Sequence, residues 1–303
     1  MQPCLICIVG PTAVGKTALS IQLAQHFNTE ILSFDSRQIY KELTIGTAKP
    51  TVLERKGIVH HFIDEISIVQ SYSAGDFQKQ ASARLEQLFQ KYKVVIAVGG
   101  TGLYLKALLE GLDSFPEPDW TLRCTLQEQY QTEGLVPLLQ QLSSLDPVTY
   151  QNVDKHNPRR VLRALEVCLQ TGKPYSSFLS QNKVKPYFKV IKIGLNMPRA
   201  ELYKRIDVRV LQMIEQGLVQ EVQGLIVQNA DFTSNALNTV GYKEIYAYLQ
   251  GQSDLSMAIH LIQQNTRRYA KRQLTWFNAD KEIQWFEPHQ WVEILRYIEL
   301  KMV

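Results

Sequence analysis

The sequence predicts an α/β fold: a phosphate-loop (P-loop) core, in which helices flank a mainly parallel sheet, with an inserted all-helical domain. Three observations lead to this prediction. A Gly-x4-Gly-Lys-Thr segment at residues 10–17 lies between an apolar run and a helical pattern. Further short apolar runs alternate with helical patterns, which is typical of parallel strands joined by right-handed crossovers. From residue 114 to residue 185 the sequence looks helical and holds no convincing strand, so we expect a core of residues 1–113 and 186–303 and an insertion of residues 114–185.

The first element is a buried strand, because residues 5–9 form an uninterrupted apolar run. The loop that follows is suited to hold a diphosphate. Its glycines let successive backbone N–H groups turn inward, Lys16 adds a cation, and the Thr17 hydroxyl can ligate Mg²⁺. Leu19, Leu23 and Phe27 then recur every four residues, as on one face of a helix whose N-terminus points at the phosphates. The predicted diphosphate-binding residues of this loop are Gly10, Pro11, Thr12, Ala13, Val14, Gly15, Lys16 and Thr17.

Two further strands end in polar loops that we expect at the same edge of the sheet. Residues 30–34 form a short strand that ends at Asp35, and the buried strand 94–98 stops at a Gly-Gly-Thr-Gly turn that contains Thr101. Because ligands of parallel sheets bind beyond the carboxyl ends of the strands, the phosphate loop, Asp35 and Thr101 should share one crevice. Two readings stay open for each side chain: Asp35 is a catalytic carboxylate or a helix cap, and Thr101 faces the ligand or serves the turn.

One helix of the insertion is well delimited by its sequence. Asn157 is expected to cap it, Pro158 to occupy its first position, and Gly172 with Pro174 to end it. Residues at helical spacing give it an apolar face and place two arginines one turn apart on another face; these are Val161, Leu165 and Cys168, and Arg159 and Arg163.

Beyond the insertion the core pattern resumes. Residues 189–195 have strand character, and a long helix follows Met197-Pro198 with a buried stripe of Leu202, Ile206, Val210 and Met213. Arg205 and Arg209 lie a turn apart beside this stripe, on a candidate phosphate-facing side. The chain closes with a strand at 282–286 and an amphipathic helix.

Composition limits the class of protein. Its 303 residues, 45% of them hydrophobic, can bury a substantial core. No apolar stretch approaches the roughly 20 residues that span a bilayer, and the N-terminal apolar run enters the phosphate loop directly, so we expect neither a membrane segment nor a secretion signal. Four cysteines without a disulfide framework indicate a reduced, cytoplasmic protein. Cys4 and Cys7 are an odd number of residues apart, so on a strand they face opposite sides, and both are interpreted as core residues.

The formal net charge is only +4, but basic residues gather in one C-terminal segment. Arg267, Arg268, Lys271 and Arg272 place four positive charges in six residues. If the segment is helical, Arg267 lies one turn from Lys271 and Arg268 one turn from Arg272, and each like-charged pair repels by about a few tenths of a kcal/mol. An anionic partner would relieve this repulsion; a solvated basic face is the alternative interpretation.

A phosphate loop most often belongs to an ATP- or GTP-using enzyme, so a small-molecule kinase of the nucleoside or shikimate type is the first alternative. Two features weigh against it. The strand 94–98 ends in Gly-Gly-Thr, where a Walker-type strand usually ends in a carboxylate that holds the Mg²⁺ shell. The run that ends at Asp64 is interrupted by His60-His61, which we interpret as one core histidine beside one surface histidine. No guanine-reading Asn-Lys-x-Asp segment is present.

The order of these motifs resembles bacterial tRNA dimethylallyltransferase, and matching segments span nearly the whole chain. Two of them most clearly separate the chain from ordinary kinases: DSRQIY at 35–40 and RRYAKRQLTWF at 267–277. The others are GPTAVGKT (10–17), GTAKP (46–50), HHFID (60–64), GGTGLYLKALL (99–109), HNPRRVLRALE (156–166), RIDVRV and MIEQGLVQEV (within 205–222), and GYKEI (241–245).

The resemblance implies an enzyme that transfers the dimethylallyl group of dimethylallyl diphosphate to the exocyclic amine of an adenosine. That adenosine lies immediately 3′ of the anticodon in tRNAs that read codons beginning with U. Diphosphate is then a leaving group, whose growing charge is stabilised by the loop N–H groups, Lys16, Mg²⁺ on Thr17 and an arginine. By resemblance this arginine is Arg209, with Arg205 as the alternate, and the general base is Asp35. The catalytic residues implied are Asp35, Thr101, Lys16 and Arg209.

The resemblance also implies that tRNA is the partner and that the target base leaves the anticodon loop to reach the crevice. The tRNA-binding residues implied are Asp35, Ser36, Arg37, Gln38, Thr101, Arg123, Arg159, Arg160, Val161, Leu162, Arg163, Arg267, Arg268, Lys271 and Arg272. Nothing in the sequence demands more than a monomer. A non-catalytic RNA-binding module with a relic nucleotide loop is a third alternative, against which the intact Lys16, Thr17 and Asp35 argue.

Overall fold

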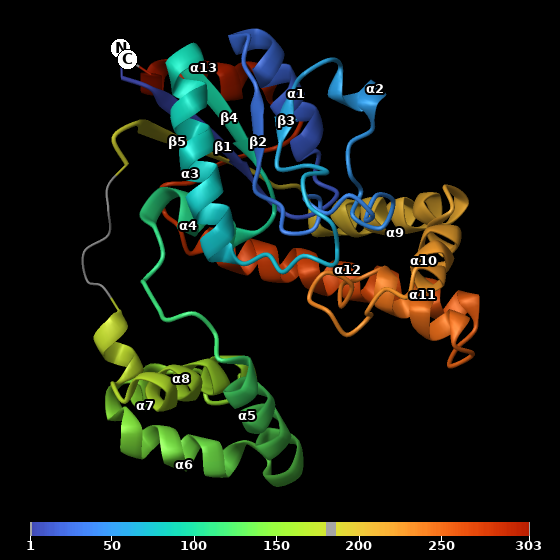
Figure 1. Cartoon of the computed structure of the whole chain (residues 1–303). Coiled ribbons are helices and arrows are strands. Elements are labelled where there is room, and N and C mark those ends of the chain that lie inside the picture. Colours follow the sequence, from blue (N-terminus) through green and yellow to red (C-terminus); the bar gives the residue numbers. More distant parts are fainter. Residues whose placement is uncertain (1, 180–185, 303) are drawn as a thin grey trace. The chain divides into compact units, whose positions relative to one another are not determined.

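The structure is a computed structural model that describes residues 2–179 and 186–302. The chain divides into two compact units (Figure 1): a core unit formed by Met1–Glu110 and Lys185–Val303, and an insertion unit, Gly111–Val184. The hydrophobic clusters respect this division, because each cluster draws its buried residues from one unit alone. Among the described residues, no helix is long and apolar enough to cross a membrane.

The predicted parallel sheet is confirmed in the core unit. Within the described residues, six parallel strands form one sheet in the order β3-β2-β4-β1-β5-β6, so that β1 lies between β4 and β5. The strands are β1 (Cys4–Val9), β2 (Ile31–Ser33), β3 (His60–His61), β4 (Val94–Val98), β5 (Lys189–Leu195) and β6 (Gln284–Phe286). β2 and β6 are shorter than the predicted strands 30–34 and 282–286, and β3 covers only the two histidines of the run that ends at Asp64. Each of these marginal strands pairs over only two or three residues with its neighbour.

Two glycines allow the strand ends to approach each other closely at the carboxyl edge. A Cβ atom on Gly10, directly after β1, would lie 2.4 Å from the carbonyl oxygen of Leu195 at the end of β5. A Cβ atom on Gly99, directly after β4, would lie 2.6 Å from the carbonyl oxygen of Phe34. Real side chains do not tolerate such contacts with backbone, so these glycines hold the loops after β1, β2, β4 and β5 close together.

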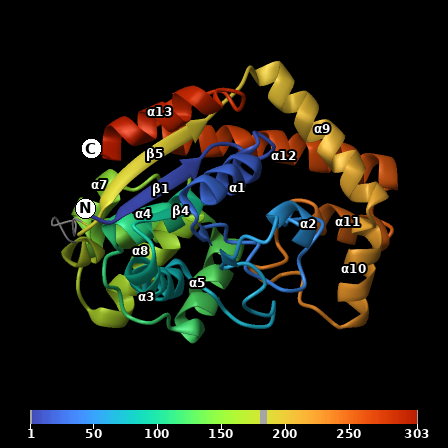
Figure 2. The ribbon, with the colours of Figure 1, turned by 90° about the horizontal axis from the view of Figure 1, so that it is seen from above.

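Helices cover both faces of the sheet. The core unit contains α1 (Lys16–Phe27), α2 (Val52–Arg55), α3 (Ala74–Lys91), α4 (Gly102–Glu110), α9 (Arg199–Glu215), α10 (Leu218–Val227), α11 (Tyr242–Leu249), α12 (Leu255–Asn278) and α13 (Trp291–Met302). Apolar side chains of α1, α9 and α13 pack in one cluster with one face of the sheet. Those of α3, α4, α10 and α11 pack in a second cluster on the other face. Figure 2 shows α13 alongside β5, with α3 and α4 on the opposite side of the strands.

The alternation of side chains along β1 explains this two-sided core. Cys4 and Ile6 join the α1 cluster, whereas Leu5 and Cys7 join the α3 cluster. The prediction that Cys4 and Cys7 are core residues on opposite faces is therefore confirmed. Burial raises the pKa of both thiols, so neither is a reactive thiolate.

The insertion unit is a small helical bundle with its own apolar centre. Its helices are α5 (Trp120–Glu133), α6 (Leu135–Leu145), α7 (Pro147–Asn152) and α8 (Pro158–Thr171), followed by a short 3₁₀ turn, η1 (Tyr175–Phe178). The predicted helix is α8, and its ends are as expected: the Asn157 side chain accepts from the Arg160 N–H, and Gly172 ends the helix with a φ of 66°. Val161, Leu165 and Cys168 form its buried face together with residues of α5 and α6.

Candidate active site

The predicted diphosphate loop joins β1 to α1 at the carboxyl edge of the sheet. Ala13 has a φ of 66° and Gly15 a φ of 108°, and Gly15 caps the N-terminus of α1. Alternation of left- and right-handed residues turns successive backbone N–H groups to one side, where they form an anion-binding nest. The same loop opens a twelve-residue helix whose dipole favours negative charge at this end. The backbone of the loop is thus suited to a phosphate group.

Lys16 lies folded against its own loop and carries a perturbed amine. Its Nζ donates to the carbonyl oxygens of Gly10, at 3.0 Å, and Pro11, at 2.7 Å. Burial lowers the pKa of Lys16 to about 7, the positive charge of Arg209 adds to this effect, and the carboxylate of Asp35 opposes it. The structure therefore brings Lys16, Arg209 and Asp35 within electrostatic reach of one another, although they come from three separate parts of the chain.

The low pKa of Lys16 gives a prediction about proton uptake. Without a ligand the amine is largely neutral above about pH 7, and a bound diphosphate favours the charged form and raises the pKa toward the usual 10.5. Binding of inorganic diphosphate at about pH 8 should therefore take up a fraction of a proton at Lys16, and this uptake should vanish as the pH falls below 7, where Lys16 is already charged. Calorimetry in buffers of different ionisation enthalpy measures it.

The control for this prediction is Lys16→Arg, because a guanidinium stays charged throughout this pH range. Protons exchanged by the diphosphate itself occur in both proteins, so the difference between them isolates Lys16. Equal proton uptake by the two proteins at about pH 8 would contradict the assignment of a low pKa to Lys16.

The structure distinguishes the two candidate arginines of α9. Arg209 is half-buried, its pKa is lowered by burial, and its charge acts on Lys16. Among the described residues it makes no ion pair within 4.0 Å, although Glu54 of α2 lies close enough to favour its charged form. Arg205 is 48% exposed and pairs with Glu201 one turn away, at 3.1 Å. Of the two arginines, Arg209 is therefore the one whose surroundings suit contact with a bound anion, and Arg205 remains the alternate.

Asp35 fixes a turn of the backbone and also acts electrostatically on Lys16 of the phosphate loop. Its Oδ1 accepts from the backbone N–H groups of Arg37, at 2.9 Å, and Gln38, at 3.3 Å, and so it caps a turn rather than a helix. Its negative charge also acts on Lys16 and on the phenols of Tyr104 and Tyr269. The helix-cap interpretation is therefore wrong, whereas the turn contact is compatible with a catalytic role, because the carboxylate that fixes the turn also acts electrostatically on Lys16.

Thr101 joins the loop after β4 to the loop after β2. Its Oγ1 accepts from the Ser36 N–H at 3.1 Å and lies 3.2 Å from the Ser36 Oγ. The phenol of Tyr269, on α12, hydrogen-bonds to Thr101, and burial together with the nearby Asp35 raises the pKa of this phenol. Tyr269 was not predicted as a site residue. The sequence signal that could have identified it is its place between Arg268 and Lys271 in the basic segment. The structure adds that its side chain is half-buried.

Gln38 and Arg37 are also held in place. The Gln38 Nε2 donates to the carbonyl oxygens of Thr47, at 3.1 Å, and Ala48, at 3.2 Å, and Arg37 donates to the Asn235 side chain at 3.3 Å. The predicted segment Asp35, Ser36, Arg37 and Gln38 is therefore a fixed turn that lies next to Thr101.

The residues that would make this site a Walker-type kinase are engaged elsewhere. Asp64 forms ion pairs with Lys49, at 2.6 Å, and Arg55, at 3.0 Å, and so does not offer a free carboxylate.

The prediction that one of His60 and His61 lies at the surface is wrong. The His61 side chain is only 13% exposed, because its two ring nitrogens contact Glu30 and Arg84.

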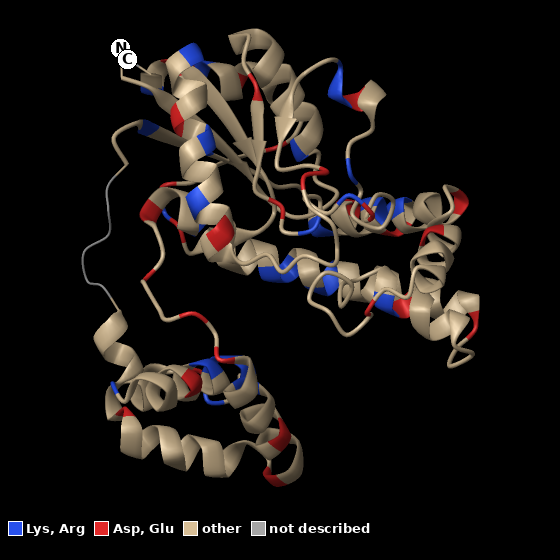
Figure 3. Ribbon diagram, in the orientation of Figure 1, with Lys and Arg blue, Asp and Glu red and all other residues tan. Residues whose placement is uncertain are grey.

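Lys and Arg residues recur along α12 (Figure 3), and the four cations of its basic cluster differ in their partners. Arg267 forms an ion pair with Asp207 of α9 and lies against the Tyr203 ring. Arg268, Lys271 and Arg272 are exposed and have no ion pair within 4.0 Å among the described residues. These three leave a cationic face on α12 that is open to an anionic partner.

In the insertion unit, the predicted arginines fall into two groups. Arg159 and Arg160 are exposed at the start of α8, whereas Arg123 and Arg163 both pair with the buried Glu166, at 2.7 and 2.8 Å. The Val161 side chain is fully buried in the bundle, so the prediction that it contacts tRNA is wrong for the side chain, and Leu162 is half-buried.

The pairing of Glu166 predicts a large stability effect. Glu166→Ala leaves Arg123 and Arg163 without their shared carboxylate, and we expect it to destabilise the insertion unit by about 3 kcal/mol, at the low end for a broken buried pair because both arginines are partly exposed. Hydrogen exchange in α5 and α8, followed in the full chain by mass spectrometry, measures this loss. Glu128→Ala, on the exposed side of α5, is the control and should change exchange little. Equal exchange in the two variants would show that the triad is not stabilising.

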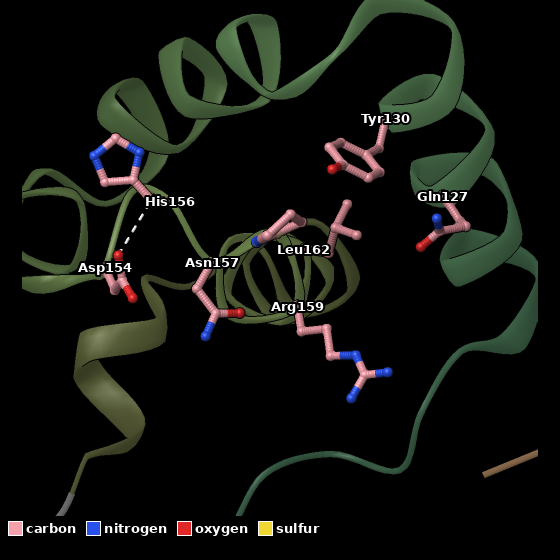
Figure 4. A pocket seen from close by; sticks show the side chains of 8 residues that line it. Gln127, Tyr130, Asp154, His156, Asn157, Arg159 and Leu162 are labelled. Carbon is pink, nitrogen blue, oxygen red and sulfur yellow. Dashed lines mark hydrogen bonds between the residues drawn. The ribbon is translucent and has the colours of Figure 1, made fainter. Parts of the chain in front are cut away.

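A hollow of about 540 Å³ lies beside the start of α8 (Figure 4). Gln127 and Tyr130 of α5 line one side, and Arg159 and Leu162 of α8 line another. The remaining lining residues precede or open α8 and are Asp154, His156, Asn157 and Pro158. The hollow is thus lined by two of the predicted tRNA-binding residues, Arg159 and Leu162.

Comparison with known proteins identifies a single family. The family described as IPP transferase matches residues 38–280. A tRNA dimethylallyltransferase of Cytophaga hutchinsonii is 51% identical over 98% of this chain and 97% of its own length, and one of Christiangramia forsetii is 51% identical over 100% and 99%. A solved full-length tRNA isopentenylpyrophosphate transferase from Bacillus halodurans has a TM-score of 0.73 and 37% identity, covering 100% of this chain and 97% of that one. A eukaryotic dimethylallyltransferase solved acting on tRNA has a TM-score of 0.78 and 31% identity over 91% of this chain and 70% of its own.

Proposed function

Since this chain belongs to the IPP transferase family, we propose that it transfers the dimethylallyl group of dimethylallyl diphosphate to tRNA, releasing diphosphate. The acceptor that we propose is the exocyclic amine of the adenosine adjacent to the anticodon on its 3′ side, in tRNAs that read codons beginning with U. The enzyme would act as a monomer in the cytoplasm, where tRNA is modified.

One observation supports this chemistry most strongly. The Lys16 amine on the phosphate loop and the Arg209 guanidinium on α9 act on each other, and the carboxylate of Asp35 acts on the same amine. A bound anion favours the charged form of Lys16 beside Arg209. A carboxylate does not bind an anion, so Asp35 is expected to serve a different reactant. A diphosphate leaving group and an incoming amine that must lose a proton together give each of the three groups a role.

The reaction can be written with these groups in named positions. The amine nitrogen of the adenosine bonds to the allylic carbon as the bond between that carbon and the diphosphate oxygen breaks. Negative charge grows on the diphosphate, where loop N–H groups, Lys16 and Arg209 stabilise it more in the transition state than in the substrate. The proton of the amine passes to the Asp35 carboxylate. Thr101, whose hydroxyl accepts from the Ser36 N–H, would orient the acceptor base.

The chain's residues fit a Mg²⁺ ion that binds together with the diphosphate. Among the described residues no cluster of three or more His, Cys, Asp or Glu side chains could hold a metal ion by itself. Mg²⁺ usually keeps several waters and takes one or two protein ligands plus phosphate oxygens, and the Thr17 hydroxyl is exposed at the start of α1, where it can serve as that ligand. When bound, the ion would neutralise charge on the departing diphosphate.

The tRNA would be held by cations on both units. The exposed face of α12, with Arg268, Lys271 and Arg272, is one contact surface, and Arg159 and Arg160 of the insertion unit are another. Contacts of this kind are made to phosphates, so they should weaken as the salt concentration rises. Arg123 and Arg163 would act with Glu166 by keeping the helices of the insertion unit in register.

The test is a direct assay of the RNA. The full chain is incubated with an anticodon stem-loop, dimethylallyl diphosphate and Mg²⁺, and the RNA is then weighed by mass spectrometry. We expect a gain of one five-carbon prenyl group in place of one hydrogen, located on the adenosine 3′ of the anticodon after nuclease digestion. Unmodified RNA, together with ATP turnover on a small alcohol, would support the kinase alternative instead.

A further inference from the structure

A buried glutamine joins the two loops to which the proposed function assigns the diphosphate and the acceptor base. Gln273 lies on α12, which passes the carboxyl edge of the sheet (Figure 1), and only 5% of it is exposed. Its Oε1 accepts from the backbone N–H of Thr12 at 2.9 Å, and its Nε2 donates to the carbonyl oxygen of Gly100 at 3.0 Å. One amide thus spans the diphosphate loop after β1 and the loop after β4 that carries Thr101.

The orientation of this amide is fixed by its partners. Thr12 offers a donor and Gly100 an acceptor, so a flipped amide would face a donor with a donor and an acceptor with an acceptor. Since the side chain is buried, water does not replace a lost bond there at low cost. Gln273 therefore sets the distance between one N–H of the diphosphate loop and the backbone next to Thr101.

Neighbouring residues of α12 bring the helix against the same loop. A Cβ atom on Gly100 would lie 2.2 Å from the Nε2 of Gln273, and one on Gly102 would lie 2.1 Å from the Nε1 of Trp276. Tyr269, one turn before Gln273, hydrogen-bonds to Thr101 itself. One face of α12 thus touches the loop 100–102 over two turns, while its exposed face carries Arg268, Lys271 and Arg272.

We propose that Gln273 is a positioning residue: it holds the diphosphate loop and the Thr101 loop at the separation that transfer requires. This inference rests on the proposed function, in which the diphosphate is bound by the first loop and the acceptor base by the second. The side chain itself touches neither reactant; it acts through Thr12 on the leaving group and through Gly100 on Thr101. A misplacement of reacting groups by about 1 Å can cost about 10²-fold in rate, so the loss of such a bridge should be measurable.

Two substitutions test this role in the full-length protein. Gln273→Met keeps the size and removes both hydrogen bonds, and we expect kcat for prenyl transfer to fall about 10- to 100-fold. Gln273→Glu keeps the acceptor for Thr12, and only when protonated can it donate to Gly100. Burial raises the pKa of such a carboxyl to about 7 or higher. Its kcat relative to the wild type should therefore rise about tenfold from about pH 8 to about pH 6, while the ratio for Gln273→Met should stay flat.

The control is Gln263→Met, the same substitution on the same helix, where the side chain donates to the carbonyl oxygen of Asp207 and to no other partner in the described part of the chain. It should keep wild-type kcat, and all three variants should bind the anticodon stem-loop within about twofold of the wild type, since the exposed face of α12 is unchanged. Should Gln273→Met unfold the chain, the pH series of Gln273→Glu alone decides, because every point of the series is measured on one variant.

Two results would overturn the proposal: wild-type kcat and KM in Gln273→Met, or a Gln273→Glu variant whose kcat relative to the wild type does not rise from about pH 8 to about pH 6. Failure of the proposed function is distinguishable from both. If the wild-type chain does not prenylate the stem-loop, the proposed function fails. Calorimetric binding of inorganic diphosphate then still tests Gln273, because the Met variant should bind it several-fold more weakly through the displaced Thr12, and equal affinity would overturn the positioning role.

Discussion

Replacing Asp35 by Ala is expected to slow prenyl transfer by about 10²- to 10⁴-fold, the usual contribution of a positioned general base. The exocyclic amine of adenine is a poor nucleophile and must be aimed and relieved of a proton. Asp35 is the carboxylate whose charge acts on Lys16, and a turn fixes its position. Single-turnover kinetics with saturating dimethylallyl diphosphate and stem-loop measure the step itself, so that slow product release does not mask the effect.

The control for Asp35 must separate chemistry from the turn. In Asp35→Asn the amide oxygen still accepts from the N–H groups of Arg37 and Gln38, but the group cannot take a proton. We expect the Asn variant to bind the stem-loop almost as the wild type does and to transfer as slowly as the Ala variant. Weakened RNA binding with unchanged turnover, in either variant, would refute the role of general base.

The second large effect is expected at Arg209. Arg209→Gln should lower kcat by about 10²- to 10³-fold, because a preorganised cation at the leaving group acts most strongly when the charge develops in the transition state. Rapid-quench measurement of labelled RNA gives kcat, and KM for the diphosphate substrate is measured in parallel. The expected pattern is a larger change in kcat than in KM.

Arg205→Gln is the matched control on the same helix. Arg205 is exposed and paired with Glu201, so the substitution should cost at most a few-fold in rate. If Arg205→Gln were the slower of the two variants, the assignment of Arg209 to the leaving group would be wrong, and the alternate arginine of the sequence pattern would take its place.

Local sequence was enough to predict the parts of the fold that depend on local pattern. The apolar run 5–9, the phosphate loop and the caps of α8 are each defined within a few neighbouring residues, and all are present. The extent of β3 could not be predicted in this way, because it is only two residues long and exists through its pairing with β2. His61 was misplaced for the same reason: its burial comes from Glu30 and Arg84, which are distant in sequence.

The same distinction explains what was missed at the site. Spacing puts Arg205 and Arg209 on one side of a helix equally well, and only packing of α9 against the loop shows which of them acts on Lys16. Gln273 meets Thr12 across 261 residues of sequence and Gly100 across 173, so no local pattern identifies its role. Its segment was identified from its charges and its resemblance to a family motif, neither of which points to this glutamine.

The central claim is that the glycine-rich loop holds diphosphate as a departing group, with the bond to carbon breaking. Dimethylallyl diphosphate labelled with oxygen-18 at the bridging position, between the allylic carbon and phosphorus, tests it most directly. After turnover with the anticodon stem-loop, we predict that all of the label leaves in the released diphosphate and that the prenyl group appears on the RNA without it. Label retained in dimethylallyl alcohol, with a phosphoryl group transferred to an acceptor, would contradict the account.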